Sequence, residues 1–170
     1  VTTTRSGRET AMTGYVRATV AGGDGDRIAA MAADVCGHAD AGATALREAK
    51  YAWAGQLRAS GDRDRALKLY KELASDVKTR EGSEAAYYVI EALFESGDLD
   101  KTESEVFAFS DREPNAYWLA KAFLLLGDVY VRKGDTFQAR ATYQSVADGY
   151  SPADDGIVDE AKERIAKLKN

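Results

Sequence analysis

The residues with the most reactive side chains are Cys36 and His38, the single cysteine and the single histidine of the 170-residue sequence. A nucleophilic thiolate needs a base within hydrogen-bond distance and a third group that orients that base. At the end of a predicted helix, this spacing points the two side chains apart. A zinc site needs about four ligands, and the pair supplies only two of them. We therefore expect a half-buried thiol and a surface imidazole.

Acidic residues suggest two further kinds of chemistry. Asp24 and Asp26 alternate as in a calcium loop, but an EF-hand needs a bidentate Glu at its twelfth position, where this sequence has Val35. The glycines around Asp24 are not followed by the Gly-Lys-Ser/Thr of a phosphate-binding loop. Asp154 and Asp155 precede a predicted helix, where carboxylates favour the helix N-terminus. We expect no metal, no cofactor and no catalysis, so the protein is predicted not to be an enzyme.

The composition excludes two classes of partner. The net charge is -5, with 30% charged and 45% hydrophobic residues. A nucleic-acid-binding protein needs a basic surface, so we expect no nucleic acid partner. The longest apolar runs, Ile28–Ala33 and Ala85–Ile90, are far shorter than the roughly 20 residues of a membrane span. Because the sequence begins with Val1 and not Met, we interpret it as part of a longer chain.

A repeated turn signal organises the sequence. Gly61, Gly97 and Gly134 are 36 and 37 residues apart, and an Asp follows each of them. Glycine can adopt the left-handed conformation that ends a helix, and the next Asp can accept a backbone N–H at the start of the following helix. The pattern predicts three helix–turn–helix repeats.

Residues around these turns resemble the tetratricopeptide repeat (TPR) pattern W-x2-L-G-x2-Y…A-x3-F…P. The third repeat follows it most closely, with Phe123, Leu126, Gly127, Tyr130, Ala139 and Tyr143. The first repeat has Leu57, Ala66 and Tyr70, with Trp53 and Ala54 in place of Leu-Gly. The second keeps Leu93 and the closing Pro114, but Val89, Ile90, Thr102 and Val106 depart from the pattern. The resemblance covers about residues 42 to 152.

The resemblance implies an all-α fold, a right-handed superhelix (α-α solenoid) of TPR-like hairpins in a single domain over residues 1–170. We predict a degenerate hairpin at 9–41, repeats at 42–78, 79–114 and 115–152, and a capping helix at 153–170. The end helices are expected at Glu9–Val20, Arg27–Cys36 and Asp154–Leu168, and residues 1–8 are expected to be frayed.

In a TPR stack the first helix of each hairpin lines a concave groove, and this implies a protein or peptide partner. The groove residues carried over are Glu48, Tyr51 and Arg58, then Glu84, Tyr87, Glu91 and Phe94, then Lys121, Leu124, Asp128, Val131 and Arg132. Their aromatic rings can alternatively pack between repeats. The Lys and Asn of a carboxylate-clamping TPR domain are replaced by Tyr51 and Gly55, so a chaperone tail is not expected.

Two classes of function remain open. The first is a scaffold that binds a polypeptide in the groove. The alternative is an envelope module for carbohydrate or a small ligand, which would need exposed tryptophans, whereas Trp53 and Trp118 are predicted to pack. Longer runs such as Ala116–Phe123 look like the C-terminal end of large TPR proteins of Gram-negative bacteria, which implies a cell-envelope or periplasmic location. The oligomeric state is left open.

Overall fold

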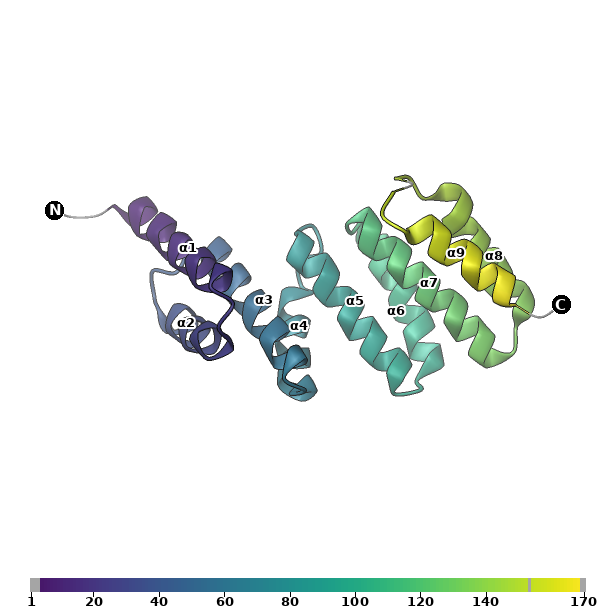
Figure 1. The fold of residues 1–170 in the computed structure, drawn as a ribbon, viewed down its shortest axis with the longest axis horizontal. Helices are drawn as coiled ribbons and strands as arrows, with labels where there is room; N and C mark the ends of the chain where they lie inside the picture. The colour runs from purple at the N-terminus through teal and green to yellow at the C-terminus, as the bar shows by residue number, and fades with distance from the viewer. Residues whose placement is uncertain (1–3, 153, 169–170) are drawn as a thin grey trace. The chain divides into compact units, whose positions relative to one another are not determined.

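The computed structural model describes residues 4–152 and 154–168, and within these ranges it contains nine helices and no strand (Figure 1). The predicted all-α class is therefore confirmed. The helices are α1 Arg5–Ala21, α2 Gly25–Gly37, α3 Ala43–Ala59, α4 Arg63–Leu73, α5 Arg80–Glu95, α6 Leu99–Asp111, α7 Ala116–Lys133, α8 Thr136–Gly149 and α9 Ile157–Lys167.

Contacts divide the chain into two compact units, residues 1–75 and 76–170. The first holds α1 to α4, in which α3 contacts α1, α2 and α4. The second holds α5 to α9, in which α7 contacts each of the other four helices. The boundary falls near the end of the repeat predicted at 42–78. The single superhelical domain stays a prediction.

The turn between the two helices of a hairpin has the predicted chemistry. The glycines of the three predicted turns are left-handed, with φ of 87° at Gly61, 85° at Gly97 and 78° at Gly134. After each, the N–H of the Asp donates to the carbonyl five residues earlier, at Leu57, Leu93 and Tyr130. The same Asp side chains then accept from the N–H of Arg65, Lys101 and Gln138. A carbonyl near the end of the first helix and an N–H near the start of the second helix are thereby hydrogen-bonded. The Gly-Asp prediction is confirmed.

The core of the first unit is small and tightly packed. Met31 and Val35 of α2 are 0% exposed, as are Ala45 and Ala49 of α3, and Val16 of α1 packs with them. Alanines at the α2–α3 contact let the two helices approach closely, so that the larger side chains fill the remaining space.

The chain becomes helical earlier than predicted. The Thr4 hydroxyl accepts from the Gly7 N–H and starts α1 at Arg5, so residues 5–8 are helical and not frayed. Residues 1–3 lie outside the described part of the chain.

The core of the second unit joins α7, α8 and α9. Leu124 and Ala139 are 0% exposed and Tyr143 is 1% exposed, and Ile157 and Ala161 of α9 complete this cluster. The helix α9 begins three residues later than predicted, because Gly156 is left-handed with φ of 85° and Asp155 accepts from the Ile157 N–H. This helix contacts α7 and α8, the hairpin that the predicted capping helix was expected to cover.

Candidate functional site

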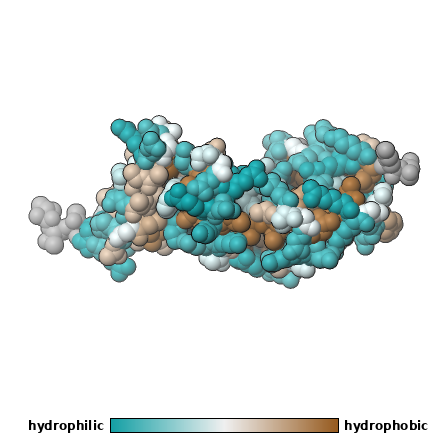
Figure 2. All heavy atoms as spheres, turned by 90° about the horizontal axis from the view of Figure 1, so that it is seen from below, coloured by the Kyte–Doolittle hydropathy of each residue, from teal (hydrophilic) through white to brown (hydrophobic). Residues whose placement is uncertain are grey.

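The odd-numbered helices carry every residue of the predicted groove. In the first unit α1 contacts α3, and in the second α5 contacts α7 and α7 contacts α9 (Figure 1). The surface view in Figure 2 is largely hydrophilic, with smaller hydrophobic areas between the hydrophilic residues. The candidate site is therefore built from side chains on α3, and separately from side chains on α5 and α7.

In the first unit, Glu48 is engaged by α1. Arg17 donates from Nη2 to Glu48 Oε1 at 2.6 Å and from Nε to Oε2 at 2.9 Å, a bidentate pair. These hydrogen bonds hold the pKa of Glu48 below its usual value. Tyr51 is half-buried and Arg58 is exposed. Sequence reasoning missed Arg17, because the degenerate first hairpin offered no repeat register from which to place it.

On α5, two predicted groove residues are mostly buried. Glu84 and Tyr87 are each 8% exposed, so little of either side chain is open to a partner. The Tyr88 hydroxyl donates to Glu84 Oε1 at 3.0 Å and the Tyr87 hydroxyl donates to Glu91 Oε1 at 3.3 Å. Burial, followed by the Glu91 charge, raises the pKa of Tyr87 far above its usual value.

Four aromatic rings from α5 and α7 form one cluster, which we call the ring cluster: Tyr87, Tyr88, Tyr117 and Trp118. The Trp118 centroid lies 5.4 Å from Tyr87, 5.9 Å from Tyr88 and 5.0 Å from Tyr117. Such spacings are typical of favourable aromatic pairs. Trp118 is half-buried and packs, as predicted. Tyr88 and Tyr117 are also half-buried and were missed, because the repeat pattern places no aromatic at their positions.

On α7 the predicted residues separate into three groups. Leu124 is 0% exposed in the core with Tyr143, so its assignment to the groove surface is corrected to the core. Lys121 and Asp128 are partly buried. Val131 is 47% exposed and Arg132 is exposed, so these two residues are open to the surface.

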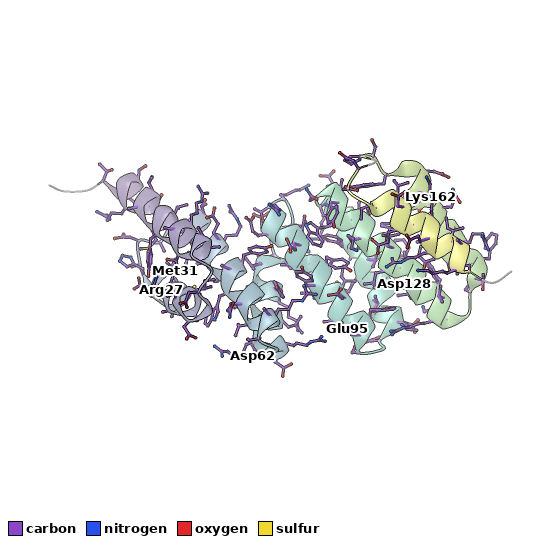
Figure 3. The ribbon with its side chains drawn as sticks, viewed as in Figure 1. Arg27, Met31, Asp62, Glu95, Asp128 and Lys162 are labelled. Atoms are coloured by element: carbon purple, nitrogen blue, oxygen red, sulfur yellow. The ribbon has the colours of Figure 1, made fainter. Side chains whose placement is uncertain are left out.

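The partly buried charges of α7 pair with α9. Lys121 Nζ lies 3.2 Å from Glu160 Oε2, and Arg164 Nη1 lies 3.6 Å from Asp128 Oδ2. Arg164 Nη2 also donates to Glu160 Oε1 at 2.8 Å. Asp128, labelled in Figure 3 beside α9, accepts from the Tyr143 hydroxyl at 2.6 Å. These ion pairs and hydrogen bonds link α9 to α7 before any partner binds.

Phe94 and Arg132 form the contact between the last turns of α5 and α7. The Arg132 guanidinium carbon lies 3.8 Å from the Phe94 ring centroid, and Arg132 Nη1 donates to the Phe94 carbonyl oxygen at 2.9 Å. A cation over an aromatic face is attracted to the ring quadrupole. The ring is therefore covered on one face by Arg132, and the guanidinium itself is the exposed element of the pair.

Cys36 and His38 form no reactive pair in the structure. Both are exposed, which corrects the expected half-burial of the thiol, and the Asp40 N–H donates to His38 Nδ1 at 3.3 Å. Partial desolvation raises the pKa of the Cys36 thiol, which disfavours the nucleophilic thiolate. Among the described residues, no three His, Cys, Asp or Glu side chains gather to hold a metal ion.

None of the described helices combines the length and the apolar character that crossing a membrane requires. No protein-family model, curated protein or solved structure matches the chain.

Proposed function

We propose that this chain is a scaffold that binds a polypeptide partner along its odd-numbered helices, in a TPR-like right-handed superhelix. Three hairpins share one turn chemistry, which favours a common hairpin geometry repeated along the chain. Helix pairs of this kind stack in register, and the first helix of each pair then faces the same side.

The observation that carries the proposal is the ring cluster, which joins α5 to α7 and reaches the surface. Tyrosine and tryptophan give large contact areas and lose little rotamer freedom on binding, and for this reason they dominate protein-binding surfaces. Tyr87 forms the buried base of the cluster, at 8% exposed. Tyr88, Tyr117 and Trp118 are half-buried, and they are the rings that a partner would contact.

Two surface residues of α7 extend this face beyond the ring cluster. Val131 contributes an apolar side chain that is 47% exposed. Arg132 contributes a guanidinium held by Phe94, so part of its ordering cost is met before binding. A partner segment with an apolar residue beside a carboxylate would match this pair.

Site-specific photo-crosslinking tests the proposal. A benzoylphenylalanine replaces Val131 on α7 in one variant and Phe137 on α8 in a control variant. Both positions are exposed, at 47% and 81%, so neither replacement disturbs the core. Under ultraviolet light in the native cells, the Val131 position should capture a defined polypeptide that mass spectrometry identifies.

Comparison with the Phe137 variant shows whether the partner binds the odd-numbered or the even-numbered helices. Capture at Phe137 and not at Val131 would move the partner to the even-numbered helices and contradict the proposal. If neither position captures a polypeptide and labelled oligosaccharide is retained by the purified chain instead, the carbohydrate alternative replaces it.

We also propose a cell-envelope location, which is supported by the resemblance of the longer sequence runs to envelope TPR proteins. Fractionation of the native cells with an antibody against the chain tests this proposal. Recovery with a cytoplasmic marker enzyme would contradict it.

A further inference from the structure

A hollow of about 560 Å³ lies between α1 and the start of α3 in the first unit. Its α1 wall contains Ser6, Thr10, Thr13 and Gly14, and its α3 wall contains Gly42 and Thr44. None of these residues belongs to the groove set that the repeat pattern predicted. The volume falls within the roughly 300–1,000 Å³ of typical ligand sites.

The α1 wall offers hydrogen-bond acceptors. The Thr10 hydroxyl donates its proton to the Ser6 carbonyl at 2.9 Å, and the Thr13 hydroxyl donates to the Glu9 carbonyl at 3.0 Å. A hydroxyl has one proton and two lone pairs. Since both protons are already used within α1, these two oxygens can only accept hydrogen bonds from a ligand.

The α3 wall adds donors. The helix is preceded by Gly42, which has no side chain to cap the first turn, and the Glu9 side chain lies against Gly42. The backbone N–H groups at the start of a helix have no partner within the helix, and Ala43 and Thr44 bring two of them to the wall of the hollow. The hollow thus presents acceptors on one side and donors on the other.

The charged residues at the hollow are already paired. Arg17 is bound to Glu48 at 2.6 Å, and Glu9 is bound to Arg5 at 3.1 Å. A charged ligand would have to compete with these pairs. A neutral ligand that carries both N–H and C=O groups fits the remaining chemistry, and a peptide main chain carries one of each per residue.

Gly14 has no packing role that explains it. Glycine in a helix interior costs roughly 0.5–1 kcal/mol relative to alanine, and a Cβ at Gly14 would meet no atom within 4 Å. A glycine does allow another backbone to approach the helix closely. Its place in the wall of the hollow makes it a point of close approach for a ligand.

The length of the hollow indicates the size of that ligand. Its wall runs along α1 from Ser6 to Arg17, which is about 17 Å at the helical rise. An extended chain covers about 3.3 Å per residue, so roughly five residues would span it.

We propose that the hollow between α1 and α3 binds an extended segment of a partner polypeptide through its main chain. The proposal rests on the function proposed above and adds to it a site in the first unit. It names the chemistry of the bound segment, which is neutral and about five residues long.

Amide chemical-shift mapping of the full chain, labelled with ¹⁵N, tests this. The probe is the blocked pentapeptide acetyl-Ala-Ser-Ala-Ser-Ala-amide, and the control probe is the same peptide with N-methylated amides. The first should shift the amide signals of Thr10, Thr13, Gly14, Ala43 and Thr44, and the N-methylated peptide should lose most of that shift. Equal shifts from both peptides, shifts elsewhere, or no shifts would overturn the proposal.

Variants provide the second arm. Gly14→Trp places a ring in the hollow and should abolish the shifts while leaving the melting temperature unreduced. Ala11→Trp, on the same helix but outside the hollow, should leave them intact. If Gly14→Trp fails to fold, Thr10→Leu removes one acceptor and should weaken the shifts at least twofold. Peptide-induced amide shifts as large in Gly14→Trp or Thr10→Leu as in the parent chain would also overturn the proposal. Crosslinking at Val131 reports on the second unit, so failure of this site is distinguishable from failure of the scaffold function.

Discussion

At the scale of single residues, the contact between Gly127 and Tyr143 sets how closely α7 and α8 pack. A Cβ on Gly127 would lie 2.1 Å from Tyr143 Cε1, and Tyr143 cannot move away freely because its hydroxyl donates to Asp128. The Gly127→Ala variant should therefore lose about 1–3 kcal/mol of unfolding free energy, a typical cost of overpacking. Urea unfolding monitored by circular dichroism measures the loss.

Gly55 provides the matched control for this prediction. It also lies inside a helix, but it is exposed and its Cβ would meet no atom within 4 Å. Gly55→Ala should raise the unfolding free energy by about 0.5–1 kcal/mol through helix propensity alone. If Gly127→Ala is as stable as the parent or more stable, the close α7–α8 contact does not exist as described.

A second residue-scale prediction concerns Glu103 on α6, which binds Lys133 Nζ at 2.6 Å and accepts from the Tyr130 hydroxyl at 2.7 Å. The Lys133 hydrogen bond, followed by that of Tyr130, holds the pKa of Glu103 below its ordinary 4.5. The interactions of the Glu103 carboxylate thus stabilise the folded state above pH 4.5. Their contribution to the free energy of unfolding is lost as the pH falls from 4.5 through the lower pKa of Glu103 in the folded state.

Glu103→Gln should consequently lower the melting temperature at pH 7, by an amount equivalent to about 1 kcal/mol or less. The difference from the parent should shrink as the pH falls below 4.5. Glu105→Gln, at an exposed position of the same helix, controls for the loss of a negative charge. A Glu103→Gln deficit that is unchanged at pH 3 would mean that the carboxylate does not carry the interaction.

At the scale of elements, α9 completes the core of the third hairpin. Its Ile157 is 1% exposed and its Ala161 is 0% exposed against α7 and α8. A chain that ends at residue 152 should expose Val146 and its neighbours, melt at a lower temperature and associate. Thermal melting and light scattering measure both effects.

Point variants in α9 test the loss of a buried side chain without shortening the chain. Ile157→Ala should cost about 2–5 kcal/mol, as for other buried large-to-small changes, whereas Asp159→Ala at an exposed position should cost much less. A truncated chain that stays monomeric and equally stable would show that α9 is not part of the core.

The turns were the elements that sequence reasoning placed best, because their chemistry is local. Gly61 acts through its own left-handed φ angle, and Asp62 accepts from the backbone N–H three residues later. Helix ends were predicted to within a few residues where such a signal existed. The start of α1 was missed, because Thr4 was not recognised as a capping residue.

The surface assignments were less successful, for a tertiary reason. A repeat register says which helix a residue belongs to, but its exposure depends on side chains from other helices. Leu124 is buried by α8 and α9, and Tyr87 is buried within the ring cluster. The hollow beside Gly14 could not be predicted at all, since it depends on how α1 lies against α3.

At the scale of the whole molecule, two compact units share one type of hairpin turn. Gly61 lies in the first unit, and Gly97 and Gly134 lie in the second. The proposed continuous stack extends this local regularity to the full chain, and it assigns partner binding to the odd-numbered helices. The most direct test of that assignment compares two exposed apolar side chains of one hairpin.

Once crosslinking has identified the partner, its affinity for two charge-introducing variants is measured by titration calorimetry. Val131→Asp on α7 should weaken binding at least tenfold, equivalent to about 1.4 kcal/mol, because a carboxylate would have to be desolvated in the interface. Phe137→Asp on α8 should bind as the parent does, and both should fold normally, since the two positions are 47% and 81% exposed. Unchanged affinity for Val131→Asp together with weakened affinity for Phe137→Asp would contradict the account.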